Sequence, residues 1–218
     1  MDKFKVLLTG LFCVGLLLMG CGEKKEQEKS EAVPPVPEEV KTCVYELNQD
    51  DTKLTWVSFK LTEKIAVKGS FDSIQVNGIK SAETLLGALG SLSFQINGGS
   101  ANSDNAERDK KLSEKYFGIM QGGLTISGNV KEVLENGSVV VSIAMNGVEK
   151  DLPLSVTVES DTTLLLKGSM DTDHWNMGAS LNSLNKVCKL LHTGKDGISK
   201  LWPNVDIIIK AAFKKTCS

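Results

Sequence analysis

Apolar and polar residues alternate with a period of two along most of the chain after residue 42. In the stretch SLSFQIN, for example, Leu92, Phe94 and Ile96 share one face, and polar residues occupy the other. Alternation of this kind over several residues predicts half-buried antiparallel strands. About eight segments carry it, at residues 54–59, 65–76, 91–97, 122–130, 138–147, 151–160, 163–171 and 205–213.

Short turns separate these segments. The pairs Asn136-Gly137 and Asn146-Gly147 are typical of tight β-hairpins, because both residue types tolerate positive φ. Short connections between about eight antiparallel strands predict an all-β domain, which is either a barrel or a sandwich. Residues 42–218 are long enough to build one complete core.

Two segments have helical periodicity instead. Residues 105–118 start with Asn105, a favourable N-cap, and continue with helix-favouring charged residues. Residues 177–197 place apolar side chains three or four positions apart and end at Gly194 or Gly197. We therefore expect one or two short helices beside the strands. The second would present an apolar face made of Leu181, Leu184, Val187, Cys188 and Leu191.

The start of the chain has a different pattern, in which Lys3 and Lys5 precede an apolar run that ends at Cys21. This run is shorter than the roughly 20 apolar residues that a transmembrane helix needs. A basic start, a short apolar stretch and small residues at its end are typical of an export signal. The sequence LMGC at 18–21 resembles the lipobox of bacterial lipoproteins. Residues 1–20 are thus predicted to be a lipoprotein signal peptide, and Cys21 to be the lipidated first residue.

The alternative interpretation is an uncleaved anchor, or a plain secretory signal with an incidental cysteine. Polar residues follow Cys21 at once, however, and residues 21–41 combine dense charge of both signs with three prolines. This composition predicts a disordered tether that joins the lipidated cysteine to the folded domain. By resemblance to lipoprotein sorting in Gram-negative bacteria, Gly22 favours the outer membrane, with the domain facing the periplasm.

The charge of the chain and its sequence motifs limit the classes of function that are possible. The chain has 25 basic and 27 acidic residues spread along it, for a formal net charge of −2. No basic stripe is present to neutralise phosphates, which argues against a nucleic-acid partner. The sequence contains no Gly-x-Ser-x-Gly pentapeptide, and no nucleophile–base pair can be assembled from its residues. The sequence therefore favours a binding or structural protein over an enzyme.

Histidines and cysteines offer the only candidates for a metal site. His174 lies beside Asp171 and Asp173, where we favour a structural or rim role over metal binding. Cys188 and His192 are four residues apart on the second predicted helix, a spacing that can hold a metal, but two ligands do not complete a tetrahedral zinc site. We expect no metal and no cofactor, with Cys188 in the core and His192 on the surface.

Three cysteines follow Cys21 along the chain, namely Cys43, Cys188 and Cys217. Outside the cytoplasm, an odd number indicates one disulfide and one free thiol. Cys43 precedes the first strand and Cys217 ends the last, so the two cysteines meet if these strands pair antiparallel. We predict a disulfide between Cys43 and Cys217, and a free Cys188.

Four segments carry a likeness to a known family. They are VKGSFDSIQV (67–76), FQINGGSANSDNAERDKKLSEKYFG (94–118), IAMNGVEKDLPLSV (143–156) and WNMGASLNSLNKVCKLLHTGKDGISKLWPNVDI (175–207). In this order they resemble the YceI-like family, the polyisoprenoid-binding proteins of bacterial envelopes, and the last resembles an envelope-lipoprotein branch. The resemblance runs from about Leu54 to Phe213. It implies an antiparallel, eight-stranded, lipocalin-like barrel that holds a long-chain amphiphile, which in some members is a polyisoprenoid quinone.

An eight-stranded barrel has room inside for side chains or for one slim ligand. A cavity lined by the apolar faces of these strands would favour a hydrocarbon tail by about 0.8 kcal/mol per buried methylene. For each lining residue, plain core packing is the alternative. A polar headgroup would be held near the mouth by Arg108 or His174, although Arg108 could instead bind its own helix or a neighbouring loop. The residues expected to line the cavity are Trp56, Phe59, Phe71, Phe94, Ile126, Val141, Ile143, Leu154, Val156, Met170 and Trp175.

Two functions follow from this reading. The first is a membrane-tethered protein that sequesters or carries an isoprenoid or another long-chain lipid in the cell envelope. The second is a structural or stress-response lipoprotein with a solidly packed barrel and an exposed apolar patch for a protein partner. A continuous internal cavity distinguishes the first from the second. The pattern is compatible with a monomer or a homodimer.

Overall fold

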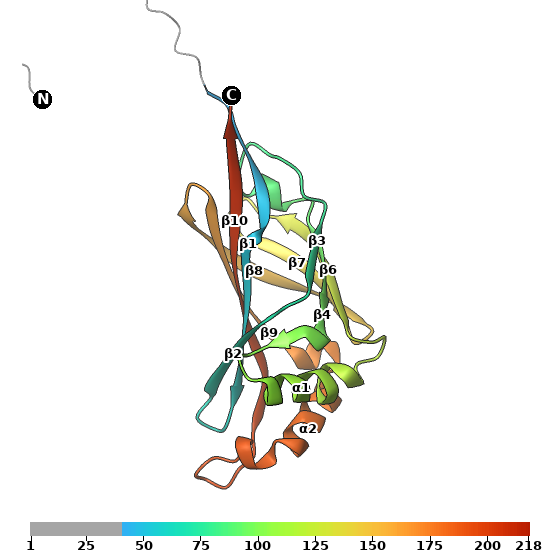
Figure 1. Ribbon diagram of the computed structural model, residues 1–218. Coiled ribbons are helices and arrows are strands. Elements are labelled where there is room, and N and C mark those ends of the chain that lie inside the picture. The colour runs from blue at the N-terminus through green and yellow to red at the C-terminus, as the bar shows by residue number, and fades with distance from the viewer. Residues whose placement is uncertain (1–40) are drawn as a thin grey trace, which may run out of the picture. The chain divides into compact units, whose positions relative to one another are not determined.

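The alternating segments of the sequence become antiparallel strands of one curled sheet (Figure 1). The computed structural model describes residues 41–218, and the predicted lipidation site Cys21 lies outside them. The sheet order is β3-β4-β6-β7-β8-β9-β10-β1-β2-β5. The strands are β1 (Cys43–Lys60), β2 (Ile65–Phe71), β3 (Ile74–Asn77), β4 (Ser93–Asn97), β5 (Ala101–Asn102), β6 (Thr125–Val133), β7 (Val139–Met145), β8 (Val148–Ser160), β9 (Thr163–Asp171) and β10 (Leu201–Cys217).

The predicted all-β antiparallel fold is confirmed, but the sheet has ten strands among the described residues and not eight. The segment predicted as one strand at 65–76 is broken at Asp72 and Ser73, so β2 and β3 lie at different places in the sheet. The backbone N–H groups of Asp72 and Ser73 donate to the backbone oxygen and the hydroxyl of Ser100, both at 3.0 Å. The chain thus leaves β2, turns this corner and continues as edge strand β3, which curls the sheet into a half-barrel.

β1 and β10 are the longest strands and pair antiparallel from Cys43↔Cys217 to Lys60↔Leu201. A disulfide joins Cys43 to Cys217, which is the pair that the strand order led us to expect. The register shifts between Asn48 and Lys53 of β1, where β1 contains extra residues relative to β10. A shift of this kind changes which side chains of a strand face the core.

Two short helices lie at one end of the sheet, as predicted (Figure 1). The first is α1 (Ala106–Lys115), and its N-cap Asn105 accepts a hydrogen bond from the Arg108 backbone N–H at 2.9 Å. The second is α2 (Gly178–Val187), which is followed by Cys188 and the 3₁₀ turn η5 (Lys189–His192). Four other 3₁₀ turns are η1 (Gly87–Leu89), η2 (Gly98–Ser100), η3 (Phe117–Ile119) and η4 (Thr172–Trp175). Within residues 41–218, no helix is long and apolar enough to cross a bilayer.

The second helix is shorter than the periodicity predicted. It ends at Val187, so the expected continuous apolar face does not form. Leu184 and Cys188 are buried, whereas Val187 and Leu191 are exposed by 47% and 62%. The periodic pattern continues past the point where the backbone changes from the α to the 3₁₀ form, and this change rotates Leu191 away from the core.

The core lies on the inner face of the sheet and includes residues of the turns η1 and η4. Its most completely buried large side chains are Val139, Leu154, Leu164, Trp175 and Met177. Every strand pairing and this whole core lie within residues 41–218, which form one unit by their contacts. A unit with its own complete sheet and its own core is the kind of segment that folds by itself.

Candidate functional site

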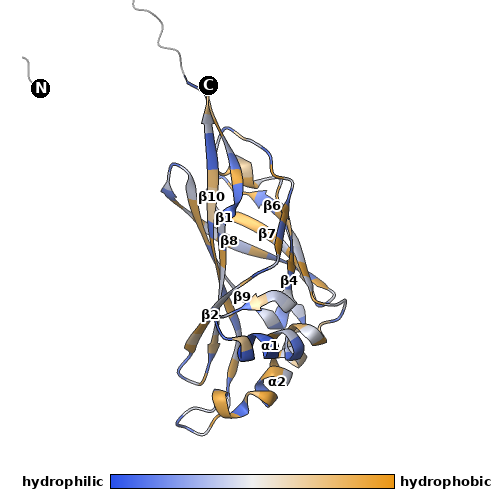
Figure 2. Cartoon of the chain, viewed as in Figure 1, coloured by the Kyte–Doolittle hydropathy of each residue, from blue (hydrophilic) through white to orange (hydrophobic). Residues whose placement is uncertain are grey.

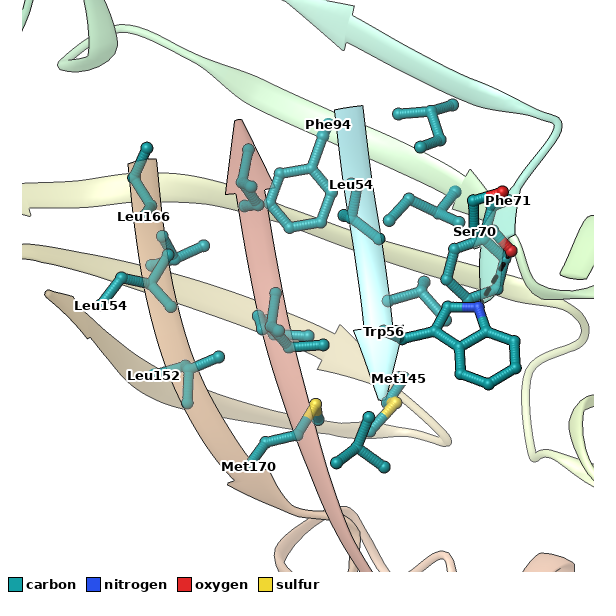
Figure 3. A pocket seen from close by; sticks show the side chains of 18 of the residues that line it. Leu54, Trp56, Ser70, Phe71, Phe94, Met145, Leu152, Leu154, Leu166 and Met170 are labelled. Atoms are coloured by element: carbon teal, nitrogen blue, oxygen red, sulfur yellow. Dashed lines mark hydrogen bonds between the residues drawn. The ribbon is translucent and has the colours of Figure 1, made fainter. Parts of the chain in front are cut away.

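The inner face of the curled sheet encloses a cavity of about 580 Å³ (Figure 3). It extends from Leu89 and Leu92, around η1, to Leu181 and Leu184 on α2. Most of its lining side chains are aliphatic or aromatic, and the polar ones are Gln49, Asp50, Thr52, Lys53, Ser58, Ser70, Asp72, Ser93 and Thr172. Cavities of a few hundred cubic ångströms with apolar walls are the usual form of a small-molecule site.

Several strands contribute to the lining with a period of two. On β10, for example, Val205, Ile207, Ile209 and Ala211 line the cavity. On β1 they change from odd to even across the register shift, so both Leu47 and Leu54 face the cavity. The bulge therefore keeps both halves of this long strand apolar on the inside.

Two glycines make room for aromatic side chains in the wall. Gly69 on β2 pairs with Trp56 on β1, and a Cβ at Gly69 would overlap the Trp56 ring. Gly128 on β6 pairs with Phe94 on β4, and a Cβ there would overlap the Phe94 ring. Both aromatic rings can lie flat against the sheet because their neighbours have no side chain.

Two polar groups of the cavity wall have hydrogen-bond partners within the domain. The indole N–H of Trp56 donates to the backbone oxygen of Ser70 at 2.9 Å (Figure 3). The Thr172 hydroxyl donates to the backbone oxygen of Pro203 at 2.9 Å. Burial raises the pKa of Tyr116 to about 12, although a hydrogen bond with Thr172 acts in the opposite direction. The Tyr116 hydroxyl is thus neutral at any physiological pH.

The structure brings most of the predicted lining residues together. Nine of the eleven line the cavity, and the two exceptions are Val156 and Trp175. Val156 is half-buried against the core, and Trp175 is fully buried and donates its indole N–H to the Ile143 backbone oxygen at 2.9 Å. Trp175 therefore belongs to the packed core. The nine that line the cavity are Trp56, Phe59, Phe71, Phe94, Ile126, Val141, Ile143, Leu154 and Met170.

The two predicted headgroup residues do not reach the cavity. Arg108 binds its own loop, because its Nε donates to the Ser103 hydroxyl at 2.7 Å and its Nη2 to the Ser103 backbone oxygen at 2.8 Å. His174 is exposed on η4 and is not among the lining residues. The structure thus shows the alternative in which Arg108 binds a neighbouring loop and no ligand headgroup.

Several lining residues were missed by the sequence analysis. Ile207 and Ile209 belong to a strand that the pattern did predict, so its period of two could have identified them. Leu47 lay before the first predicted strand, and only the bulge brings it inside. Tyr116 lies in the C-cap of α1, where no periodicity indicates the direction of a side chain.

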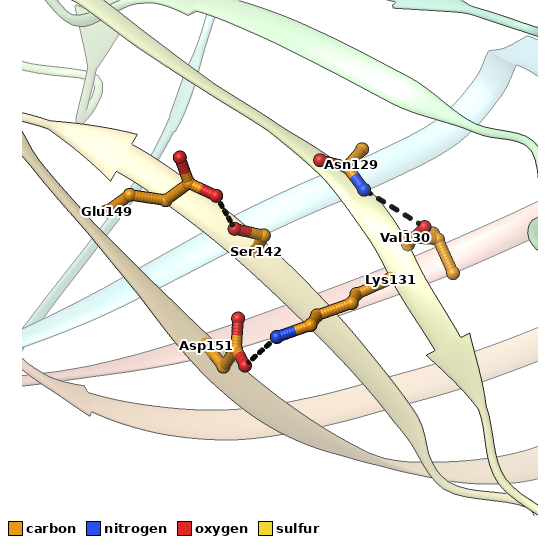
Figure 4. A network of polar contacts seen from close by, with 6 residues as sticks. All are labelled: Asn129, Val130, Lys131, Ser142, Glu149 and Asp151. Atoms are coloured by element: carbon orange, nitrogen blue, oxygen red, sulfur yellow. Dashed lines mark hydrogen bonds and ion pairs between the residues drawn. The ribbon is translucent and has the colours of Figure 1, made fainter.

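The outer face of the same sheet is polar (Figure 4). Lys131 on β6 forms an ion pair with Asp151 on β8 at 2.6 Å. The Ser142 hydroxyl on β7 donates to the Glu149 carboxylate at 2.5 Å. Ser142 therefore bonds outside while its neighbours Val141 and Ile143 line the cavity, as strand alternation requires.

The pair Cys188 and His192 does not form a metal site. Within residues 41–218, no three side chains of His, Cys, Asp or Glu gather to hold a metal ion. Cys188 is a buried free thiol, and burial raises its pKa. His192 was expected on the surface but is only 8% exposed, and its Nδ1 lies 3.0 Å from Oδ1 of Asn185. The loop that folds back after η5 covers its ring, which the sequence did not reveal.

Comparison with known proteins identifies the family. The model of the YceI-like domain family matches residues 45–213. The chain belongs to the YceI-like family. No curated protein sequence matches the chain. Three solved structures of other proteins are similar to this YceI-like domain, as follows.

A polyisoprenoid-binding domain from Saccharophagus degradans, implicated in plant cell wall breakdown, matches with a TM-score of 0.53 and 15% sequence identity, over 79% of this chain and 98% of that one. BcnA of Burkholderia cenocepacia matches with a TM-score of 0.49 and 15% identity, over 78% of this chain and 99% of that one. A YceI protein of Campylobacter jejuni matches with a TM-score of 0.44 and 16% identity, over 68% and 85%. At these identities, the first match supports the YceI-like fold.

Proposed function

We propose that this YceI-like domain holds a long-chain amphiphile, such as a polyisoprenoid or an isoprenoid quinone, in its internal cavity. The observation that carries the proposal is a mainly apolar space of about 580 Å³ on the inner face of the sheet. Burying hydrocarbon there contributes about 0.8 kcal/mol per methylene. The similar domain from Saccharophagus degradans is described as polyisoprenoid-binding, which is consistent with the proposal.

The polar end of the ligand is proposed to lie near Tyr116 and Thr172. Both residues line the cavity at its helical end, where the Thr172 hydroxyl already donates to Pro203 but its oxygen can still accept, and Tyr116 carries a phenolic O–H. The raised pKa of Tyr116 keeps its hydroxyl neutral, so it can donate a hydrogen bond to a carbonyl without introducing a charge. These residues take the role that the sequence had given to Arg108 or His174.

The cellular part of the proposal rests on the first 41 residues. A lipidated Cys21 and a charged, proline-containing tether would keep the domain close to a membrane. The expected membrane is the outer membrane, with the domain on its periplasmic side. In that position the domain would sequester or transfer lipid between membranes, and it would act as a binding protein and not as an enzyme. The alternative function, that of a structural domain, requires a solidly packed interior. The cavity argues against this alternative.

The test is to extract the purified protein and identify bound lipid by mass spectrometry, and then to offer isoprenoid quinone to the empty protein. Two matched variants on β10 sharpen it. Ile207→Trp fills the cavity, whereas Ile208→Trp adds the same side chain at a neighbouring position that does not line it. Uptake should be lost in the first variant and retained in the second. A protein that emerges empty and takes up no isoprenoid, or two variants that behave alike, would contradict the proposal.

A further inference from the structure

A second group of apolar residues lies outside the cavity, in the chain segments at the end of the domain opposite the disulfide (Figure 2). In the part of the chain that the structure describes, nine large apolar side chains are exposed, and five of them fall within residues 60–65 and 186–200. We call these two segments the tip. The five side chains are Ile65, Val187, Leu190, Leu191 and Ile198, with Leu190 exposed by 90%.

Hydrogen bonds join the two segments of the tip to each other. The Lys60 ammonium donates to the Leu191 backbone oxygen at 3.3 Å, which ties the β1–β2 turn to η5. The Thr62 hydroxyl donates to the Asp196 carboxylate at 2.6 Å, which ties the same turn to the loop after η5. The exposed leucine side chains are therefore held in place by the fold and do not belong to a loose end.

The charge of the tip differs from that of the whole protein. Its two segments contain six lysines and two carboxylates, a formal charge of +4, whereas the whole chain carries −2. Apolar side chains framed by lysines are typical of surfaces that enter the interface of an anionic bilayer. Two copies of the tip would repel each other, which argues against this face as a dimer contact. The lysines are Lys60, Lys64, Lys186, Lys189, Lys195 and Lys200, and the carboxylates are Glu63 and Asp196.

We propose that the tip docks on the surface of an anionic lipid bilayer. Leu190 and Leu191 enter the boundary between headgroups and acyl chains, and the exposed lysines Lys186, Lys189 and Lys195 contact lipid phosphates. α2 lines the cavity with Leu181 and Leu184 and ends in the tip at Val187, so docking places one wall of the cavity next to the lipids. Docking does not depend on which ligand the cavity holds.

The tip lies far from the point where the described domain begins. Cys43 is at the other end of the β1–β10 pair (Figure 1). The 17 residues of β10 span about 55 Å at a rise of roughly 3.3 Å per residue. Contact of the tip with lipid is thus separate in sequence from attachment through a lipidated Cys21.

Vesicle co-sedimentation of residues 41–218, which lack the predicted anchor, tests this proposal. The domain should bind vesicles made of equal parts phosphatidylglycerol and phosphatidylcholine, bind phosphatidylcholine alone weakly, and dissociate at high salt. Replacing Leu190 and Leu191 together by serine should lower the partition coefficient by more than about tenfold. Lys189→Gln should lower it about fivefold. Matched controls are Val158→Ser, which removes an exposed valine outside the tip, and Lys80→Gln, which removes an exposed lysine outside it.

Three results would overturn the proposal. The first is a wild-type domain that does not bind the anionic vesicles. The second is equal loss of binding in the leucine double variant and in Val158→Ser. The third is a domain that dimerises through the tip and does not bind vesicles. Sedimentation would then give a dimer mass for the wild type and a monomer mass for the leucine double variant. Circular dichroism of each variant establishes that it is folded.

Discussion

At one end of the β1–β10 pair, a disulfide joins Cys43 to Cys217, whereas at the other end the chain turns through Leu61–Lys64 against the loop that precedes Leu201. The disulfide end is closed further by two backbone hydrogen bonds between Thr42 and Ser218, at 3.0 and 3.2 Å. The tip is closed only by non-covalent contacts. The same pair of strands is thus fastened in two different ways.

The contacts at the tip are polar and cationic. The Trp202 indole N–H donates to the Leu61 backbone oxygen at 2.7 Å. The ammonium groups of Lys64 and Lys200 lie 4.4 and 4.7 Å from the centre of the same indole ring. These contacts hold the backbone of the tip while Leu190 and Leu191 stay exposed. The comparison shows that the fold does not need the apolar side chains of the tip, which leaves them available for binding.

The largest expected effect is at the disulfide end. Replacing Cys43 and Cys217 by serine should lower the free energy of unfolding by about 3–5 kcal/mol, because the bond closes a loop between residues 174 positions apart and so restricts the unfolded chain. Urea denaturation measures the loss. Cys188→Ala, which removes the free thiol, is the control.

The tip should be unaffected by that change. Vesicle binding of the folded double-serine variant should equal that of the wild type, because the tip lies at the far end of the strand pair. Equal stability of the oxidised and reduced proteins would show that strand pairing alone closes this end, and the contrast between the two ends would disappear.

The second expected effect is a dependence of stability on pH that arises from a buried histidine within the tip. Burial lowers the pKa of His192 to about 4, and the positive charges of Lys60 and Lys111 act in the same direction. In the unfolded chain the ordinary histidine pKa is about 6.5, so the unfolded state takes up the proton first as the pH falls. The folded protein therefore loses stability between pH 6.5 and 4, by about 1–3 kcal/mol.

A matched variant isolates this effect from the titration of carboxylates. His192→Gln keeps a side chain that can bond Asn185 but cannot titrate, so the difference between its urea stability and that of the wild type should change across this pH range. A difference that is constant from pH 7 to pH 4 would mean that the folded protein accommodates the charged ring.

The sequence was sufficient to predict most of the strands, the disulfide pair and nine of the residues that line the cavity, because these follow from local periodicity and from the order of the strands. It was not sufficient where one element decides the orientation of another. The register shift after Asn48 reverses the inward face of β1, and the break at Asp72 moves β3 to the opposite edge of the sheet. Neither site carries a glycine or proline that would have signalled it.

The polar parts of the site were the hardest to predict. Arg108 is close in sequence to Ser103, and a short-range contact of this kind competes with any role at a cavity mouth. His192 and Leu191 are neighbours with opposite outcomes, because the 3₁₀ turn at η5 buries one and exposes the other. Hydrophobic periodicity alone assigned Leu191 to the core.

The smallest expected effect is at the exposed face of the tip itself. Leu190 is 90% exposed, so it loses almost no contact with water when the chain folds. Leu190→Ser should therefore change the free energy of unfolding by less than about 0.5 kcal/mol, measured by urea denaturation, as should Val158→Ser outside the tip. Only the first of these two variants should weaken vesicle binding. If Leu190→Ser instead cost more than about 1 kcal/mol, the leucine would be packing against the domain in solution. The tip would then be closed by its own apolar side chains, in the way that the opposite end is closed by its disulfide.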